Sequence, residues 1–423
     1  MNRKIAAILI AGVMIMTVFA GCGGKNSDSN ETNQKDYGTN FRTDMMIPEE
    51  GYLHGLCYLY MERRDQADYH AVLRAMNNLG VKSLRTWMHF SYFMSDPDTL
   101  IDSQVDAMKE YLSEAEKYGF QIIGMNHYNN DPKGGFRIGK QRRLFADRKD
   151  SDYRLWLKDY EKSWYTLVST FPEIKYWEID NELNNPDFMY IDGDRDNAMS
   201  QEDMAAVALD MMFYASRAIH RANPDAVTVM GGLVEMWGLG KGNSWNGTYV
   251  GDIPSFLEIL YDYIESGEFG SIYPDDFFQV AAWHPYYYEK GPDDDFVRLN
   301  NEIYEIIKRR EGKDKKVFLT EFGWFENHTS LENITAWIPQ LYECIHDEMP
   351  YVESLHYFIL FNRRDDSPWQ NYGGLYYDPR ESSQDYILST GEIAVGQPKS
   401  SAYAYQRSAG GSGDITIIDK ENK

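Results

Sequence analysis

The sequence predicts an α/β fold in which eight parallel strands and eight helices form one closed (β/α)8 barrel. Eight short apolar runs recur along the 423 residues, and a helical pattern follows each of them. The runs are continuously hydrophobic, as expected for parallel strands covered on both faces. Eight alternations of strand and helix favour a closed barrel over an open doubly wound sheet. The strand candidates are Gly51–Tyr60, Ser83–Phe90, Gln121–Tyr128, Tyr176–Glu182, Val227–Leu233, Phe278–Tyr286, Val317–Gly323 and Ser354–Phe361.

Helical periodicity between these runs is clearest in two segments. In the first, apolar residues recur at i, i+3, i+4 and i+7, namely at Val72, Ala75, Met76 and Leu79. The second begins after Ser200, and Asp203 stands three residues on, as in a capping box with Asp in place of Glu. Gly80 and Gly119 follow the first two predicted helices, where left-handed C-terminal caps favour glycine.

The N-terminal segment predicts that the protein is exported and does not look like part of the folded domain. Arg3 and Lys4 precede an apolar stretch from Ile5 to Phe19, which is short for a membrane span and has the flanks of a signal peptide. The ending Phe19-Ala20-Gly21-Cys22 resembles the lipobox of bacterial lipoproteins, which implies acylation of Cys22. An ordinary signal peptide cleaved nearby is the alternative. We expect residues 1–21 to be a lipoprotein signal peptide.

Composition divides the remaining chain into three parts. Residues 22–45 are rich in Gly, Ser, Asn, Asp and Thr, which is typical of a flexible linker. Residues 46–408 hold all eight strand candidates and form the predicted barrel domain. Residues 409–423 contain Gly410, Gly411 and Gly413, and we expect a loose C-terminal tail there.

The charge of the chain excludes some partners. The formal net charge is −24, and loss of residues 1–21 removes two positive charges and no negative ones, which gives −26. Such a surface repels phosphate backbones and anionic headgroups, so we expect no nucleic-acid partner and no membrane contact except through the lipid on Cys22. We also expect a monomer. Neither G-x-G-x-x-G after the first strand nor G-x-x-x-x-G-K-[ST] occurs, so no nucleotide-binding signature is present.

Two further features bear on disulfides and metals. Cys57 and Cys344 could pair, but two free thiols are the preferred interpretation because one bridge is no disulfide framework. The Asp192–Asp203 segment nearly follows the calcium-loop pattern of oxygen donors, with Asn at position 6 and Asp at position 12. A solvated acidic loop that caps the next helix is the favoured interpretation, with a structural calcium site as the alternative.

Polar and aromatic residues gather where the predicted strands end. Unpaired burial of such groups costs several kcal/mol, on the order of 2–7, so six such strand ends are hard to explain as core packing. In a barrel, these ends meet at one face, where we expect the chemistry. The residues concerned include Arg85, Trp87, His127, Asn181, Glu182, His284, Tyr286, Glu321 and Trp324.

Glu182 and Glu321 end the fourth and seventh predicted strands, which lie across the mouth of a closed barrel. Retaining glycosidases need one protonated carboxyl to protonate the leaving oxygen and one carboxylate to attack the anomeric carbon, roughly 5–5.5 Å apart. Proximity of the two would raise the pKa of one, and a neighbouring cation would keep the other ionised. The alternative is a structural, salt-bridged pair at the strand ends.

The motifs around these residues resemble clan A glycoside hydrolases. Trp177-Glu178-Ile179-Asp180-Asn181-Glu182 resembles their fourth-strand motif, and Phe318-Leu319-Thr320-Glu321-Phe322-Gly323 resembles their seventh-strand motif. The pattern is closest to family 5, which includes cellulases and mannanases, and a family 39-like member is the alternative. The resemblance implies a single catalytic barrel domain with no redox or nucleotide cofactor.

The same resemblance implies a role for each matching residue. Glu182 would be the acid/base and Glu321 the nucleophile. Asn181 would bind the 2-hydroxyl of the sugar, and Arg85 would keep the nucleophile ionised. Further substrate-binding or positioning residues implied by position are His127, His284, Tyr286, Trp87 and Trp324. His127 and His284 could instead be ordinary pocket histidines, and each Trp could be a core residue.

One departure concerns the eighth strand, which commonly ends in a tryptophan in family 5. Here it reads His356-Tyr357-Phe358-Ile359-Leu360-Phe361. We expect Phe361, or Trp369 in the following loop, to take the place of that tryptophan. The departure leaves the exact family and the sugar open.

The predicted function is hydrolysis of β-glycosidic bonds in an extracellular poly- or oligosaccharide, with retention and through a covalent glycosyl-enzyme. The expected location is extracytoplasmic, with the lipid at Cys22 holding the protein to the cell membrane. Three alternatives remain at this point: an inactive glycan-binding barrel, a transporter-linked solute-binding lipoprotein, and a transglycosidase that uses the same residues. Loops near 129–150, 184–200 and 233–253 would decide between endo and exo action.

Overall fold

The computed structural model describes the barrel and part of the segment that follows it. The described residues are 53–64, 67–126, 148–149, 151–186, 188–189, 199–237, 252–362, 372–378, 386–387, 393–394 and 396–417. All of them lie in the compact unit formed by residues 38–423. The predicted signal peptide, Cys22 and the linker lie outside the described residues, as do His127, Trp369 and most of the Asp192–Asp203 segment.

The main sheet is the predicted closed barrel, and every strand pairing in it is parallel. The strand order is β7-β6-β5-β2-β1-β11-β10-β9-β8, which follows the chain around the ring. Within the described chain, these strands are β1 His54–Cys57, β2 Ser83–Trp87, β5 Gln121–Asn126, β6 Tyr176–Ile179, β7 Val227–Met230, β8 Leu233–Trp237, β9 Ala281–Tyr287, β10 Val317–Phe322 and β11 Val352–Tyr357.

The fifth predicted strand is divided in two, and its halves pair with opposite neighbours, which closes the barrel. β7 pairs with β6, whereas β8 pairs with β9, and only Gly231 and Gly232 separate the two strands. A Cβ atom on Gly231 would lie 2.3 Å from the carbonyl oxygen of Ile179, so the backbones of β6 and this turn meet at a distance that only glycine permits. Eight barrel strands are therefore present, and the fifth is interrupted at its centre.

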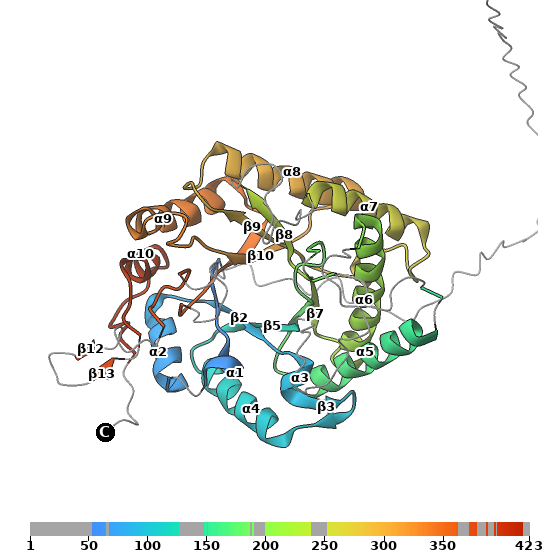
Figure 1. Ribbon diagram of the computed structural model, residues 1–423, viewed down its shortest axis with the longest axis horizontal. Coiled ribbons are helices and arrows are strands. Elements are labelled where there is room, and N and C mark those ends of the chain that lie inside the picture. The colour runs from blue at the N-terminus through green and yellow to red at the C-terminus, as the bar shows by residue number, and fades with distance from the viewer. Residues whose placement is uncertain are drawn as a thin grey trace, which may run out of the picture. The chain divides into compact units, whose positions relative to one another are not determined.

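Eight helices surround the sheet (Figure 1). In the described chain they are α2 Tyr69–Leu79, α4 Asp102–Glu116, α5 Ser151–Thr170, α6 Gln201–Ala222, α7 Ile253–Ser266, α8 Asp294–Glu311, α9 Leu331–Glu348 and α10 Ser400–Ser408. The last helix, α10, packs against α2 and α9, which completes the ring. The described chain also contains shorter elements: α1 Tyr60–Arg63, α3 Phe90–Phe93, β3 Met94–Asp96, β4 Thr99–Leu100, η2 Pro274–Asp276, β12 Tyr386–Ile387 and β13 Ile393–Ala394.

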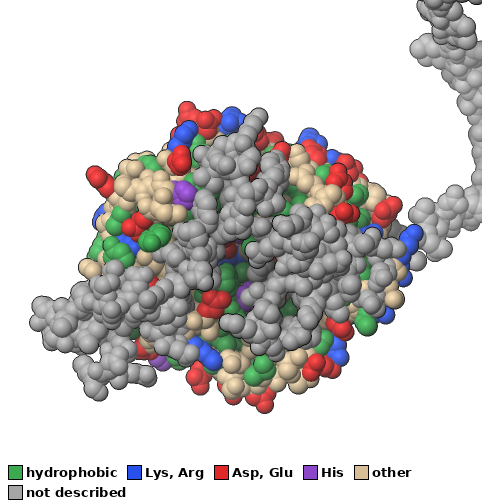
Figure 2. Space-filling model, in the orientation of Figure 1, with side chains coloured by type: hydrophobic (Ala, Val, Ile, Leu, Met, Phe, Trp, Pro, Cys, Tyr) green, Lys and Arg blue, Asp and Glu red, His purple; other side chains and the backbone are tan. Residues whose placement is uncertain are grey.

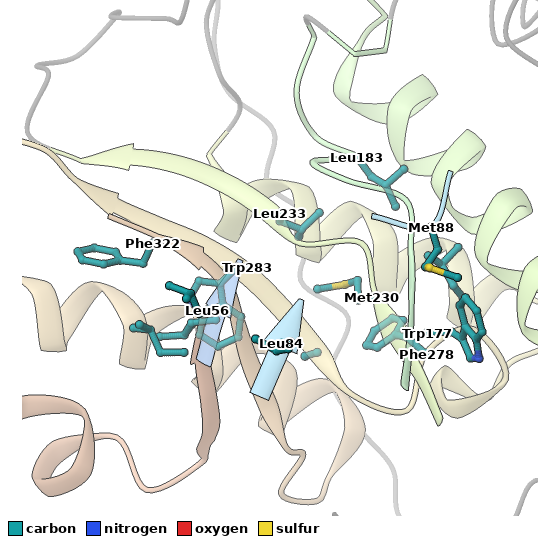
Figure 3. Close-up of a cluster of buried hydrophobic side chains, with 14 of the residues drawn as sticks. Leu56, Leu84, Met88, Trp177, Leu183, Met230, Leu233, Phe278, Trp283 and Phe322 are labelled. Carbon is teal, nitrogen blue, oxygen red and sulfur yellow. The ribbon is translucent and has the colours of Figure 1, made fainter. Parts of the chain in front are cut away.

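Side-chain alternation along the strands separates two kinds of interior. Leu56, Leu84 and Trp283 are completely buried in the layer between the sheet and the helices, and Figure 3 shows them among that core. A smaller apolar cluster, which includes Phe318, Ala282 and Val280, is formed by alternate residues of the strands. Because strand residues alternate between faces, Arg85 and His284 point away from the helices, into the barrel.

The predicted helix ends agree with the structure. The Ser200 hydroxyl accepts from the Asp203 backbone N–H at 3.1 Å, so Ser200 is the N-cap of α6. Gly80 ends α2 in the left-handed region, with φ at +87°, as a C-terminal cap requires.

Cys57 and Cys344 are both free thiols, the first buried and the second half-buried. Burial raises the pKa of Cys344 to about 11, with the nearby Glu348 carboxylate contributing.

The expectation of a loose tail from residue 409 is wrong for residues 409–417. Ile415 and Ile417 are 1% and 0% exposed and belong to the main core. The Ile415 carbonyl accepts from the Tyr376 hydroxyl at 2.7 Å, and the Asp414 carbonyl accepts from the Asn78 side chain at 2.6 Å. Gly411 and Gly413, before this pair, lie against Asn78 and Leu79 at the end of α2.

The described surface carries charges of both signs around its rim (Figure 2). Within the same part of the chain, no helix combines the length and the apolar character needed to cross a membrane.

The packing of the final segment can be tested by mutation. Ile417→Ala should lower the free energy of unfolding by about 2–5 kcal/mol, because a buried Ile side chain leaves a cavity. Denaturant titration of the domain measures this change. Ser412→Ala, at an exposed position of the same segment, should change it by less than about 0.5 kcal/mol. Equal stability of the two variants would show that the segment is loose after all.

Candidate active site

The two predicted glutamates face each other at the C-terminal end of the barrel strands. Glu321 lies on β10, and Glu182 lies three residues after the end of β6. Each is 6% exposed, and a carboxylate oxygen of one lies within 4.8 Å of a carboxylate oxygen of the other. The structure therefore brings two buried carboxyl groups to one small site.

The backbone that carries Glu182 is strained. Asp180 and Glu182 have φ angles of +71° and +50°, a backbone region that residues other than glycine rarely adopt. The Asp180 carboxylate accepts from the Asn181 N–H at 2.8 Å, and the Glu182 N–H donates to the Gly232 carbonyl at 2.9 Å. These bonds hold a turn that costs on the order of 1–3 kcal/mol per strained residue, and the turn directs Glu182 into the barrel mouth.

A bulge in β10 explains how two consecutive residues, Thr320 and Glu321, both face the site. The register of β10 against β11 shifts between Leu319 and Phe322, and these two flanking side chains both lie in the core under the helices. In a regular strand, neighbours point to opposite faces. The extra residue of the bulge lets Thr320 and Glu321 point inward together.

Arg85 is the completely buried cation at the centre of the site. Its Nη1 donates to Glu321 Oε1 at 2.5 Å, and its Nε and Nη2 donate to the two oxygens of Glu178 at 2.5 and 3.1 Å. Nη2 also donates to Asn181 Oδ1 at 2.7 Å. One guanidinium thereby fixes three side chains, a use of its planar fork that lysine could not reproduce.

Glu178 is a site residue that the sequence reasoning missed. It was part of the fourth-strand motif but received no role there. In the structure it is completely buried on β6, and its Oε1 also accepts from the Thr320 hydroxyl at 2.9 Å and from the Gly232 N–H at 3.1 Å. The available signal was a carboxylate in the middle of an apolar run, where burial without a cation is costly.

The surroundings of Glu321 favour its ionised form. Burial by itself would raise the pKa of Glu321, but attraction to His284 when its ring is protonated and to Arg85, together with hydrogen bonds from Tyr286 and Arg85, outweighs it and lowers the pKa. Tyr286 donates its hydroxyl to Glu321 Oε2 at 2.9 Å. Burial and the Glu321 charge raise the pKa of Tyr286 well above its usual value, so this hydroxyl keeps its proton.

Glu182 has two buried partners of a different kind. His284 Nδ1 lies 3.1 Å from Glu182 Oε1, and Asn185 donates its side-chain N–H to Glu182 Oε2 at 2.7 Å. The same His284 nitrogen lies 3.8 Å from Glu321 Oε2. Asn185, which is 1% exposed, was not among the predicted site residues, since an asparagine three residues after the motif carries no distinctive signal.

Asn181 is held by Arg85 so that one end of its amide is defined. The acceptance by Oδ1 identifies the oxygen, which leaves the NH2 group as the donor of this 7% exposed side chain. An amide donor at the edge of two carboxyl groups is suited to bind a hydroxyl group.

The predicted aromatic residues separate into two groups. Trp87 is half-buried and packs against the apolar cluster that contains Tyr286. Trp324 is 1% exposed, packs on Phe322 and Trp337, and donates its Nε1–H to the Lys290 carbonyl at 2.9 Å. The substrate-binding role expected for Trp324 is therefore corrected: its ring belongs to the core beneath α9 and presents no free face.

Of the two replacements expected at the end of the eighth strand, Phe361 is corrected, and Trp369 lies outside the described residues. Phe361 packs on Tyr58 and Tyr376 within the main core. Phe358, three residues earlier, belongs instead to the cluster of Tyr286 beside the two carboxyl groups. The strand ends at Tyr357, four residues before Phe361, so Phe358 is the first aromatic side chain beyond it.

Among the described residues, Glu182, His284 and Glu321 are the group whose donor atoms could surround a metal ion, since they lie within 4.8 Å of one another. The Arg85 guanidinium already supplies a positive charge to Glu321 at 2.5 Å, which reduces the attraction of a further cation. The predicted calcium segment at Asp192 and the predicted site residue His127 lie outside the described residues.

The sequence matches no protein-family model and no curated protein at a significant level. Solved structures do share the fold. A family 39 glycoside hydrolase from Bacteroides cellulosilyticus is 18% identical with a TM-score of 0.53, and the match covers 86% of this chain and 64% of that one. An endo-1,4-β-D-mannanase from Thermotoga petrophila is 16% identical with a TM-score of 0.51 over 85% and 99% of the two chains.

A β-glucosidase from Pyrococcus furiosus is 11% identical with a TM-score of 0.56, over 84% of this chain and 85% of that chain. The chain thus spans less than two thirds of the family 39 enzyme and most of the other two. These likenesses show that the chain shares the (β/α)8-barrel fold of these glycoside hydrolases.

Proposed function

We propose that this protein is a retaining glycoside hydrolase that cleaves β-glycosidic bonds in an extracellular poly- or oligosaccharide. The observation that carries the proposal is the short distance between Glu182 and Glu321. A carboxylate oxygen of Glu182 lies within 4.8 Å of a carboxylate oxygen of Glu321. Retaining enzymes place their carboxyl groups about 5–5.5 Å apart, whereas inverting enzymes need about 6.5–9.5 Å to admit a water molecule. The short separation favours double displacement.

Glu321 is the nucleophile in this proposal. Its lowered pKa keeps it ionised near neutral pH, with the cationic Arg85 and the Tyr286 hydroxyl bound to its two oxygens. These bonds also orient the carboxylate toward Glu182. In the first step, a Glu321 oxygen forms a bond to the anomeric carbon while the bond from that carbon to the leaving oxygen breaks.

Glu182 is the acid/base. It gives its proton to the leaving oxygen in the first step, and its carboxylate then takes a proton from water in the second step. That water attacks the anomeric carbon and releases Glu321. Asn181 supplies an amide donor for a sugar hydroxyl, and Trp87 supplies a half-buried ring for stacking. The family 39 enzyme, the mannanase and the glucosidase that share the fold support a glycan as the substrate.

A transglycosidase would use the same two carboxyl groups and differ only in the acceptor. A barrel that binds glycan without turnover would have no use for a buried carboxyl pair with one member held ionised. Product analysis with and without added sugar acceptor separates hydrolysis from transfer.

The location of the enzyme is a further part of the proposal. The lipobox-like Phe19-Ala20-Gly21-Cys22 supports an extracytoplasmic protein that is anchored to the cell membrane by a lipid on Cys22. Labelling of cells with an alkyne fatty acid should mark the wild-type chain and leave Cys22→Ala unmarked. Equal labelling of both chains would refute the anchor and leave the enzymatic proposal untouched.

Removal of either carboxyl group should abolish most turnover. Glu182→Gln and Glu321→Gln should each reduce kcat by about 10²–10⁴-fold on aryl β-glycosides or polysaccharides, because a positioned acid or nucleophile is lost. Thermal unfolding should shift by only a few degrees, since the amide retains the hydrogen-bonding shape. Glu302→Gln, on the exposed side of α8, is the matched control. Full activity in either site variant would sink the assignment.

The acidic limb of the pH profile reports the ionisation of Glu321. The lowered pKa of Glu321 keeps the nucleophile ionised below the usual range of a glutamate, so kcat/KM should fall only below about pH 4.5. Tyr286→Phe removes one hydrogen bond that lowers this pKa, so the limb should move to higher pH by about one unit. A pH series of kcat/KM for both proteins measures the shift, and movement of the limb to lower pH would contradict it.

A further inference from the structure

His284 lies between two oxygen atoms, and both of its ring nitrogens are occupied. Nδ1 lies 3.1 Å from Glu182 Oε1, and Nε2 lies 3.0 Å from the Thr320 hydroxyl oxygen. His284 and Thr320 are both completely buried. The position of the protons along this line decides which form of Glu182 the site favours.

The line begins at Glu178, which can only accept hydrogen bonds. Arg85 donates to both oxygens of Glu178. Its Oε1 faces three groups: Arg85 Nη2 at 3.1 Å, the Gly232 N–H at 3.1 Å and the Thr320 hydroxyl at 2.9 Å. Because both Glu178 oxygens already accept from N–H groups, the Thr320 hydroxyl is the donor in its contact and gives its single proton to Glu178 Oε1.

The direction of that bond fixes the next one. Thr320 has used its proton, so its oxygen presents only lone pairs to His284 Nε2. The contact at 3.0 Å is a hydrogen bond only if Nε2 carries a proton. Nδ1 of a neutral His284 then carries a lone pair, and it faces Glu182 Oε1 at 3.1 Å. One proton must lie between these two atoms, on Glu182 or on Nδ1.

We infer that Thr320 is a positioning residue that fixes the tautomer of His284 and so makes Glu182 and His284 share one proton. The inference rests on the proposed function of Glu182 as acid/base and states how that residue is kept supplied with its proton.

The contact between His284 and Thr320 requires a glycine at position 232. A Cβ atom on Gly232 would lie 2.2 Å from His284 Nε2 and 2.6 Å from the Thr320 hydroxyl oxygen. Because Gly232 has no side chain, its backbone can lie next to His284 and Thr320, and its N–H donates to Glu178.

The arrangement serves both halves of double displacement. In the first half, the shared proton passes from Glu182 to the leaving oxygen as the glycosidic bond breaks. The Glu182 carboxylate then faces the bare Nδ1 lone pair, and this repulsion makes the carboxylate a stronger base. In the second half it takes a proton from the attacking water, which restores the shared proton.

Other titratable groups face the pair or Thr320. They come from β1, β2, β6, β9 with the residue after it, β10 and β11, and they are Cys57, Arg85, Glu178, Tyr286, Tyr288, Glu321 and His356. Burial, aided by the Arg85 charge, lowers the pKa of His356 to about 3, so His356 is neutral. Burial raises the pKa of Tyr288 well above its usual value. Loss of the shared proton is thus the change expected along the alkaline limb.

Thr320→Val and Thr320→Ser test the inference. Valine leaves Nε2–H without an acceptor, so His284 should change to the Nδ1–H tautomer and donate to the Glu182 carboxylate. That bond favours ionised Glu182, so the alkaline limb of kcat/KM should move to lower pH by about one unit, which is tenfold in the proton equilibrium. Hydrolysis of the glycosyl-enzyme should slow about tenfold. Serine keeps the hydroxyl and should retain the wild-type limb.

A second measurement needs no substrate. Proton–nitrogen spectra of the histidine-labelled domain, with the His284 signals identified by their loss in His284→Asn, should show Nε2–H in the wild type and in Thr320→Ser. They should show Nδ1–H in Thr320→Val. Nδ1–H in the neutral wild-type ring, or identical spectra and pH limbs for valine and serine, would overturn the inference. Absence of glycosidase activity with the expected spectra would refute the proposed function alone.

Discussion

The buried guanidinium of Arg85 is the interaction on which the site depends. It bonds to Glu178 and Glu321, two carboxylates from opposite sides of the barrel, and to Asn181 beside Glu182. Two negative charges and one positive charge are thereby removed from water together, so each carboxylate is stable only while the guanidinium is in place. Loss of the guanidinium would cost about 3–5 kcal/mol, because it would leave both buried carboxylates uncompensated. The orientation of Glu321 and the proton position at Thr320 both follow from this cluster.

Departures from regular strand geometry bring the side chains of that cluster together. Gly231 and Gly232 interrupt the fifth strand where side chains would collide with Ile179 and His284. A bulge in β10 turns Thr320 and Glu321 inward together, and the left-handed residues after β6 turn Glu182 toward them. The left-handed residues and the second register shift of β10 lie at the C-terminal end of the strands, whereas the apolar cluster around Phe318 contacts the buried His356, whose Nε2 lies 2.8 Å from the Ser83 hydroxyl oxygen. The strained residues thus lie where chemistry would use them.

The positions of the strands and of the two glutamates were predictable because apolar runs and the polar residues that end them are local signals. Glu178 and Asn185 were missed, since their roles depend on which neighbouring strand supplies a donor. Trp324 was predicted to contact substrate, but an aromatic residue after a strand can face either the mouth or the helices, and the direction depends on the bulge. Ile415 and Ile417 were missed because a short apolar pair after glycines has no periodicity. The sequence could not place the tautomer of His284, which depends on contacts among three strands and Gly232.

The most direct measurement of the central claim is the mass of the domain after reaction with an activated 2-deoxy-2-fluoro β-glycoside. Such a reagent forms the glycosyl-enzyme but slows its hydrolysis, because the fluorine destabilises the positively charged transition state. The account predicts that one sugar is added per chain, on the peptide that contains Glu321, and that Glu321→Gln gains none. A sugar attached to Glu182, or no covalent adduct in a protein that still turns over β-glycosides, would contradict the assignment of the two carboxyl groups.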